Sequence, residues 1–295
     1  MEKLYKIETH MHTSQGSACA VSTGEEMARA HKAAGYDAII ITDHFFGGNT
    51  TVPRDLPWER RIDLYCAGYD EARRVGEEIG LKVFFGLEWA WQGTEYLTYG
   101  IGREWLKAHP EMEEWDIPTY LTNVRAAGAY VSHAHPFRQA SYLHGEPRIF
   151  PEFEDAVEIY NSGNADNAWN LQALEYARKY GLAMTSGSDD HDAKALRGGG
   201  MAFATPFETM EDFIRAVRTR QPFVVLTGEN AAHAKVLRLK NGDAVTVCDG
   251  EGTDYACTVS DVSSGQISLV VHRAEQSESE AAARCSVYMA FAKAD

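Results

Sequence analysis

The stretch DAIIITDH at residues 37–44 decides the fold. Its unbroken apolar run is typical of a buried strand in a parallel sheet, and the run ends abruptly in an aspartate and a histidine. The segment GEEMARAHKAAGY, residues 24–36, has helical spacing and follows a cap candidate at Ser22 or Thr23. Before it, LYKIETHMH at residues 4–12 reads as another strand. This order of elements predicts a βαβ unit.

The same alternation continues to about residue 222, so we predict an α/β protein. Further strand-like runs lie at 81–89, 129–136, 156–162 and 182–191, and helical patterns lie at 59–79, 119–127, 173–181 and 210–220.

Metal-binding and acidic side chains stand at the end of one predicted strand after another. In barrels of parallel strands this edge carries the active site, so we expect a single site built from many loops. Six of the eleven histidines belong to this set, far more than random placement gives. Its members are His10, His12, Asp43, His44, Glu88, His133, His135, Glu158, Asp189 and His191.

The spacing within these motifs suits metal coordination. Strand side chains alternate with a period of two, so His10 and His12 share a face, as do Asp189 and His191. Glu88 offers a carboxylate able to bridge two ions. Imidazole and carboxylate without thiolate fit Zn²⁺, Mn²⁺ or Fe²⁺.

Composition excludes several classes of protein. With 295 residues, 44% hydrophobic and 24% charged, the chain is long enough for two globular domains and is not disordered. Its formal charge of −15 disfavours generic coating of nucleic acid. No apolar run approaches the length of a membrane span, and the N-terminus lacks a secretory pattern, so we expect a cytoplasmic protein with no membrane partner. Its five scattered cysteines predict reduced thiols.

The chain changes character near residue 223. From there, short alternating runs are interrupted by NGD (241–243), DGEG (249–252) and SSG (263–265). This pattern predicts a small antiparallel β-barrel or sandwich. We therefore predict two domains, 1–222 and 223–295.

The motifs HMHT, TDH, GLE, HAHP and SDDH, in this order over residues 1–222, resemble those of the polymerase and histidinol phosphatase (PHP) family. The resemblance implies a distorted (β/α)7 barrel and a metal-dependent phosphoesterase with two or three divalent ions. It also implies that His10, His12, Glu88 and Asp189 hold one ion, that His44 and His191 contribute to another, and that His135 joins Glu88 at a third. His133 is the weaker candidate within HAHP.

Two departures from the family pattern bear on the number of ions. Ser17 and Ala18 stand where many relatives carry an Asp or His, and Tyr96 stands near the position of a further histidine. Water, Tyr96 or substrate could complete the coordination. A non-catalytic, degenerate site is the alternative.

Candidates for chemistry beyond metal binding are Asp43 and His44, which could protonate a leaving alkoxide, and Arg138, whose planar fork matches two phosphate oxygens. Arg197, before a run of three glycines, is a weaker candidate. Four tryptophans could line the pocket or belong to the core: Trp89, Trp91, Trp105 and Trp115.

The segment from about residue 223 resembles the N-terminal part of the ribosomal RNA small-subunit methyltransferase E family. The resemblance implies a PUA-like barrel that contacts RNA, without methyl transfer, because the catalytic domain would begin near Asp295. A basic patch at Lys235, Arg238 and Lys240 or a solvated strand face are both open interpretations. The residues that carry the resemblance are His233, Val236, Leu237, Arg238, Leu239, Lys240, Gly242 and Asp243.

The sequence therefore predicts a phosphomonoesterase that uses metal-activated water on a small phosphorylated metabolite or nucleotide. Two alternatives stay open: an RNA-associated binding protein with a degenerate PHP site, and a metal hydrolase acting on another bond, such as C–N.

Overall fold

The N-terminal part of the chain forms a single nine-stranded sheet. The computed structural model describes residues 3–140, 143, 147–225, 239–248, 253–263 and 266–276. The strand order is β7-β6-β5-β4-β3-β2-β1-β8-β9. The strands are β1 (Tyr5–Glu8), β2 (Ala38–Ile41), β3 (Lys82–Trp91), β4 (Thr94–Tyr99), β5 (Tyr130–His133), β6 (Ala156–Asn161), β7 (Ala183–Gly187), β8 (Met201–Phe203) and β9 (Phe223–Val225).

Six of these strands form two parallel groups that run in the same direction. β1, β2 and β3 pair in parallel, as do β5, β6 and β7. β4 lies antiparallel between β3 and β5 and restores the direction. The β3–β4 hairpin turns at Gln92 and Gly93, which both have positive φ (49° and 83°), as a type I′ turn requires. All six parallel strands therefore end at the same edge of the sheet.

The sheet curves until its distant parts meet. Met11, just after β1, forms an isolated parallel bridge with Asp190, just after β7, and the His12 amide donates to the Asp190 carbonyl at 2.9 Å. The result is a nearly closed barrel-like sheet, which confirms the predicted fold class. The antiparallel placement of β4, β8 and β9 could not be read from the sequence pattern.

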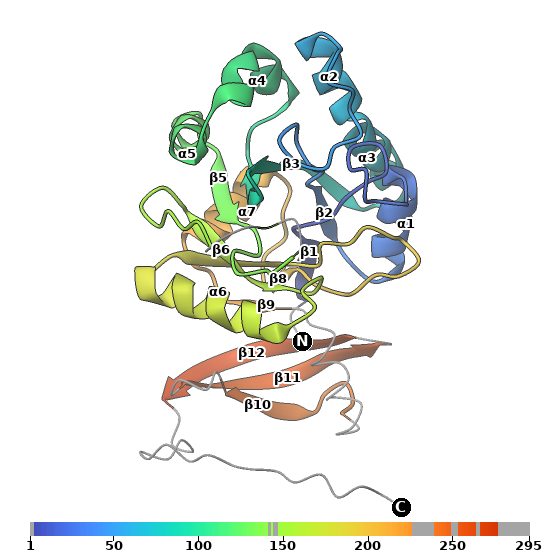
Figure 1. Cartoon of the computed structure of the whole chain (residues 1–295). Coiled ribbons are helices and arrows are strands. Elements are labelled where there is room, and N and C mark those ends of the chain that lie inside the picture. Colours follow the sequence, from blue (N-terminus) through green and yellow to red (C-terminus); the bar gives the residue numbers. More distant parts are fainter. Residues whose placement is uncertain are drawn as a thin grey trace, which may run out of the picture.

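Helices cover the outside of the sheet (Figure 1). α1 packs against α3, which lies on β3, and α6 lies on β6. Caps fix several ends: Thr23 and Glu26 form a capping box at α1, and Gly181 (φ 64°) ends α6. The helices are α1 (Gly24–Ala33), α2 (Trp58–Tyr65), α3 (Ala67–Ile79), α4 (Arg103–Ala108), the 3₁₀ helix η1 (Pro110–Glu114), α5 (Ile117–Ala126), α6 (Asn167–Tyr180) and α7 (Met210–Arg218).

The aromatic residues mainly build the core. Trp89 is buried and stacks on Tyr120 with ring centroids 3.9 Å apart. Trp91, Trp105 and Trp115 are partly buried and pack against the same cluster. The tryptophans therefore stabilise the fold, and none of them lines the cavities described below. Within the described ranges, no helix is long and apolar enough to cross a membrane.

The C-terminal part contains a three-stranded antiparallel sheet of β10 (Ala244–Cys248), β11 (Thr253–Ser263) and β12 (Gln266–Gln276). The antiparallel pattern agrees with the sequence expectation. Lys235 and Arg238 of the predicted basic patch lie outside the described residues.

Strand β9 refines where the barrel ends. Phe223, Val224 and Val225 pair antiparallel with β8, and the Phe223 ring lies 5.7 Å from that of Phe203. The barrel sheet thus extends three residues past the predicted division at 222, and the two-domain division stays a prediction.

We predict that a chain ended after Val225 is more stable than one ended after Pro222. The shorter chain loses the β8–β9 pairing and the packing of Phe223, which we expect to cost about 1 to 2 kcal/mol. Urea unfolding of the two truncated chains measures the difference. Equal midpoints and slopes would show that β9 contributes nothing to the barrel.

Candidate metal centre

The structure brings all seven predicted metal ligands together at the edge where the parallel strands end. Overlapping groups of potential ligand atoms lie within 4.8 Å of one another. They are His10, His12 and Asp189; His10, Glu88 and His135; and His12, His44 and His191.

Glu88 occupies the centre of this arrangement and is fully buried. Its Oε1 lies 3.2 Å from both His10 Nε2 and His135 Nε2. Its Oε2 lies 2.7 Å from His44 Nδ1 and 3.6 Å from His12 Nε2. A single carboxylate thus faces four imidazoles, the geometry expected of a bridging ligand.

Neighbouring groups hold three of the candidate histidine ligands, His10, His12 and His191, in the tautomer that metals bind. His10 Nδ1 pairs with Glu158 Oε1 at 2.9 Å, and His191 Nδ1 pairs with the Asp189 carbonyl at 2.7 Å. His12 Nδ1 pairs with Ser17 Oγ at 3.0 Å. With Nδ1 protonated, each Nε2 lone pair points away from its partner. Such partners are typical of metal-binding histidines.

The arrangement of the potential ligand atoms fits divalent cations. His12 Nε2 lies 3.2 Å from His10 Nε2 and 3.1 Å from Asp189 Oδ1, so three acceptors converge. Glu88 Oε2 and His44 Nδ1 are buried without a hydrogen-bond partner. Converging acceptors repel unless positive charge lies between them, and nitrogen and oxygen ligands suit Zn²⁺, Mn²⁺ or Fe²⁺.

The electrostatics favour ionised carboxylates at this site. Burial alone would raise the pKa of Glu88, but His44 and His10 hold it well below its usual value. Burial is likewise outweighed at Asp189, where His10 and Arg138 lower the carboxyl pKa. Both groups therefore carry the charge that a metal ligand needs.

Backbone strain marks two of the candidate ligands. His135 and Asp189 have positive φ values of 29° and 57°, a region that non-glycine residues rarely occupy. The packing around the candidate ligands is also tight. A Cβ atom added at Gly187 would lie 2.4 Å from His10 Cβ. Gly187 thus leaves the space that His10 occupies.

Ser17 and Tyr96, which depart from the family pattern, bind neighbouring side chains in the structure. Ser17 Oγ donates to Asp43 Oδ1 at 2.8 Å and accepts from the His44 amide at 2.9 Å, so Ser17 orients neighbouring residues. The Tyr96 hydroxyl donates to Glu154 at 3.1 Å instead of entering the metal centre.

Two side chains that the sequence analysis did not select do enter the metal centre. Glu95 Oε2 lies 3.6 Å from His135 Nε2, and its Oε1 lies 3.7 Å from His44 Nδ1. Burial and Glu88 raise the pKa of Glu95 to about 8. Cys19 lines the same cavity as His44 and His191. Alternation along β4 could have indicated Glu95, because Tyr96 faces the opposite side.

The remaining candidates take different positions. The Asp43 carboxylate accepts from the Thr13 amide and the Thr13 hydroxyl, both at 2.6 Å, and from Ser17, so it does not join the ligand clusters. His133 pairs with Glu154 at 2.9 Å, away from Glu88.

The two arginine candidates both contact residue 189. Arg138 pairs with Asp189 Oδ2 at 2.7 Å and donates to Asn161 and Asn164. Arg197 donates to the Asp189 carbonyl at 2.5 Å. The glycines after Arg197 pack tightly: a Cβ at Gly200 would lie 2.3 Å from the Ile7 carbonyl oxygen. This run is therefore a close-packed segment beneath β1.

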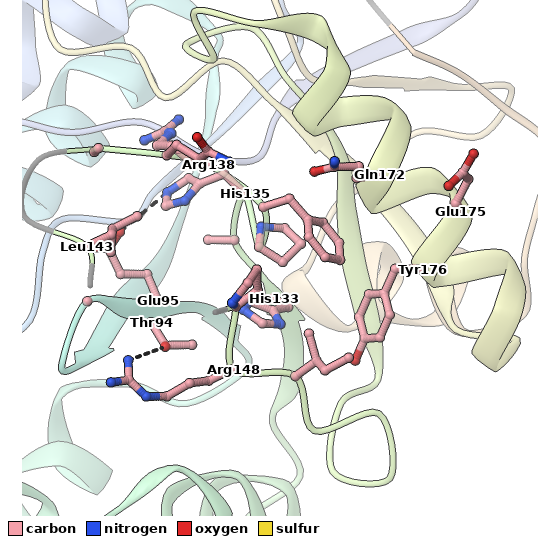
Figure 2. A pocket seen from close by; sticks show the side chains of 18 of the residues that line it. Thr94, Glu95, His133, His135, Arg138, Leu143, Arg148, Gln172, Glu175 and Tyr176 are labelled. Atoms are coloured by element: carbon pink, nitrogen blue, oxygen red, sulfur yellow. Dashed lines mark hydrogen bonds and ion pairs between the residues drawn. The ribbon is translucent and has the colours of Figure 1, made fainter. Parts of the chain in front are cut away.

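Two cavities adjoin the metal centre. One, of about 840 Å³, is lined by Cys19, His44, Asp189 and His191. The other, of about 780 Å³, is lined by His133, His135 and Tyr176 (Figure 2). Glu95, Arg138 and Arg148 border both, so a ligand in either cavity meets two guanidinium groups.

Comparison with known proteins agrees with the motifs. Residues 167–222 match the sequence model of the PHP-associated family, and residues 226–271 match that of the RNA methyltransferase PUA domain. These matches confirm both resemblances drawn from the sequence. The chain is also 39% identical over 82 residues to an uncharacterised protein of Methanocaldococcus jannaschii; the alignment covers 26% of this chain and 35% of that protein.

One solved structure shows the same fold, and a second is reported for comparison. A two-domain protein from Bacteroides vulgatus, described as containing a predicted PHP-like metal-dependent phosphoesterase, superposes with a TM-score of 0.57 at 17% identity, over 88% of this chain and 77% of the other. A protein from Bifidobacterium adolescentis described as a metal-dependent phosphoesterase gives a TM-score of 0.46 at 17% identity, over 74% and 97% of the two chains.

We predict that Cys19 is unusually acidic in the metal-free protein. Burial opposes ionisation of the thiol, but hydrogen bonds with His191 and His44 lower its pKa to about 6. The thiolate therefore predominates above about pH 6, and alkylation by iodoacetamide should reach half its maximal rate near that pH. Mass spectrometry of the labelled peptides reports the rate at each pH.

Cys66 is the control, because burial raises the pKa of its thiol. Its alkylation should be slow and should rise only above pH 9. Coincident profiles for the two cysteines would contradict the prediction.

Proposed function

We propose that this chain is a metal-dependent hydrolase that cleaves a phosphate ester of a small metabolite or nucleotide. The observation that carries the proposal is the convergence of four imidazoles on the buried Glu88 carboxylate. Proteins rarely bury so many potential metal ligands around one carboxylate without a cation to bind.

The proposed ligands divide among two or three ions. His10, His12 and Asp189 would hold one with Glu88, His44 and His191 would contribute to a second, and His135 with Glu88 would define a third position. Glu95 is a further oxygen donor beside His44 and Glu88. When bound, divalent ions lower the pKa of a water molecule and neutralise the charge of a phosphoryl group.

The chain itself supplies orientation and charge. Ser17 accepts from the His44 amide and contacts His12 Nδ1, while the Asp43 carboxylate accepts a hydrogen bond from the Ser17 hydroxyl. We therefore assign Asp43 a positioning role, and His44 remains the candidate that stands close enough to a substrate to donate a proton. This assignment replaces the pairing of Asp43 with His44 in proton transfer.

Positive side chains at the cavities favour an anionic substrate. Arg138 and Arg148 border both cavities, and Lys179 lines the one in Figure 2. Guanidinium groups match the oxygens of a phosphoryl group. Because guanidinium groups border both cavities, we favour a phosphate ester over an uncharged amide or other C–N substrate.

The match to an RNA methyltransferase PUA domain supports a second role, contact with RNA through the C-terminal segment. This role is compatible with hydrolysis. The seven candidate ligands that meet at the metal centre weigh against the alternative of a degenerate, purely binding protein.

We predict that His135→Ala lowers the metal content and His133→Ala does not. The two histidines are two residues apart in the same motif, but His135 faces Glu88 whereas His133 faces Glu154. Elemental analysis of both purified variants should show the loss of about one ion per chain for His135→Ala alone. Equal loss of metal in both variants, or no loss in either, would show that His135 is not a metal ligand.

We predict that Arg138→Ala lowers kcat/KM for the best phosphate ester by about 30- to 900-fold, or roughly 2 to 4 kcal/mol of transition-state stabilisation. Arg148→Ala is the comparison, because Arg148 reaches the cavities while bonded to the Gln92 carbonyl. Metal content is measured alongside, since Arg138 also touches Asp189. Unchanged kcat/KM for Arg138→Ala would exclude phosphate recognition by this residue.

A further inference from the structure

A second cluster of potential metal ligands lies behind the metal centre. It consists of Glu8 at the end of β1, His31 on α1 and Asp190 directly after β7. The three residues are at most 1% exposed. Glu8 and His31 lie outside the motifs that predict the main site, and Asp190 lies within SDDH but was not among the predicted ligands.

Each ligand atom is directed by the contacts of its own side chain. Glu8 Oε1 accepts from the amides of Thr9, His10 and Ser188, all at 2.9 Å, which leaves Oε2 toward the cluster. Asp190 Oδ1 accepts from the Arg197 amide, also at 2.9 Å.

His31 has the orientation of a metal-binding imidazole. Its Nδ1 lies 2.9 Å from the Met27 carbonyl oxygen, which can only accept, so Nδ1 carries a proton. In the neutral ring, Nε2 is then an acceptor directed at the two carboxylates. A backbone carbonyl on the far nitrogen is a common support for a metal-binding histidine.

The distances suit coordination better than direct hydrogen bonding. His31 Nε2 lies 3.6 Å from Asp190 Oδ2, beyond hydrogen-bond range. Two ligands about 2.0 to 2.1 Å from a tetrahedral ion lie roughly 3.3 to 3.5 Å apart. Both His31 Nε2 and Glu8 Oε2 are buried with no hydrogen-bond partner.

We propose that Glu8, His31 and Asp190 bind a divalent transition-metal ion, of the Zn²⁺ class, at a structural site separate from the main metal centre. Two carboxylates and a neutral imidazole balance the charge of one such ion. The ion stabilises the segments that carry the main ligands, because Glu8 also binds the amides of His10 and Ser188, and Asp190 follows Asp189.

The test counts zinc ions in reconstituted protein. Metal-free full-length wild type, His31→Gln and His109→Gln are loaded with Zn²⁺, freed of unbound metal and analysed for zinc per chain. His109 is the matched control: its Nδ1 also faces a carbonyl four residues earlier, that of Trp105, but its ring stacks on Trp105 instead of facing carboxylates.

We expect His31→Gln to bind one ion fewer than the wild type, and His109→Gln to bind the same number. The His135→Ala variant, which addresses the main centre, should keep the ion at Glu8, His31 and Asp190, so failure of the main site is distinguishable. Equal zinc content per chain in His31→Gln and in the wild type overturns the proposal. The three side chains would then share protons instead of a metal ion.

If His31→Gln does not fold, crystals of the wild type grown with zinc decide the question. An anomalous scattering peak at the zinc edge between Glu8, His31 and Asp190 supports the proposal. A peak at the main centre with none at this position overturns it.

Discussion

The negative charge of the buried Glu88 carboxylate is the constraint on which the site depends. Its two oxygens face four imidazole nitrogens, and burying this charge is costly unless protons on the imidazoles or bound cations offset it. The surrounding structure nevertheless holds the candidate ligands firmly: Glu158, Ser17 and the Asp189 carbonyl fix three rings. Holding the ligand set in place before a cation binds lowers the stability of the folded chain, and such preorganisation is typical of metal-dependent active sites.

The barrel provides this arrangement through strand direction. Because β1, β2, β3, β5, β6 and β7 are parallel, residues that follow them in sequence meet at one edge. β4 departs from this direction yet serves the same site, since its hairpin with β3 brings Glu95 beside Glu88. The bridge between Met11 and Asp190 then joins the first and last ligand segments.

The sequence predicts what depends on local pattern and misses what depends on side-chain direction. Histidines and acids at strand ends indicated one shared site, and the family resemblance then singled out His10, His12, Glu88 and Asp189, which the fold places together. The turn of Asp43 toward Thr13, and of His133 toward Glu154, depends on partners distant in sequence. Cys19 and the cluster of Glu8, His31 and Asp190 were missed for the same reason, since only the folded chain brings them together.

The most direct test of the central claim is a panel of phosphate esters assayed with the metal-free protein before and after addition of Mn²⁺, Zn²⁺ or Mg²⁺. The account predicts no release of phosphate without metal, and release that rises with added ion until the sites around Glu88 are filled. Equal hydrolysis with and without metal, or no hydrolysis of any ester by fully loaded protein, would contradict it.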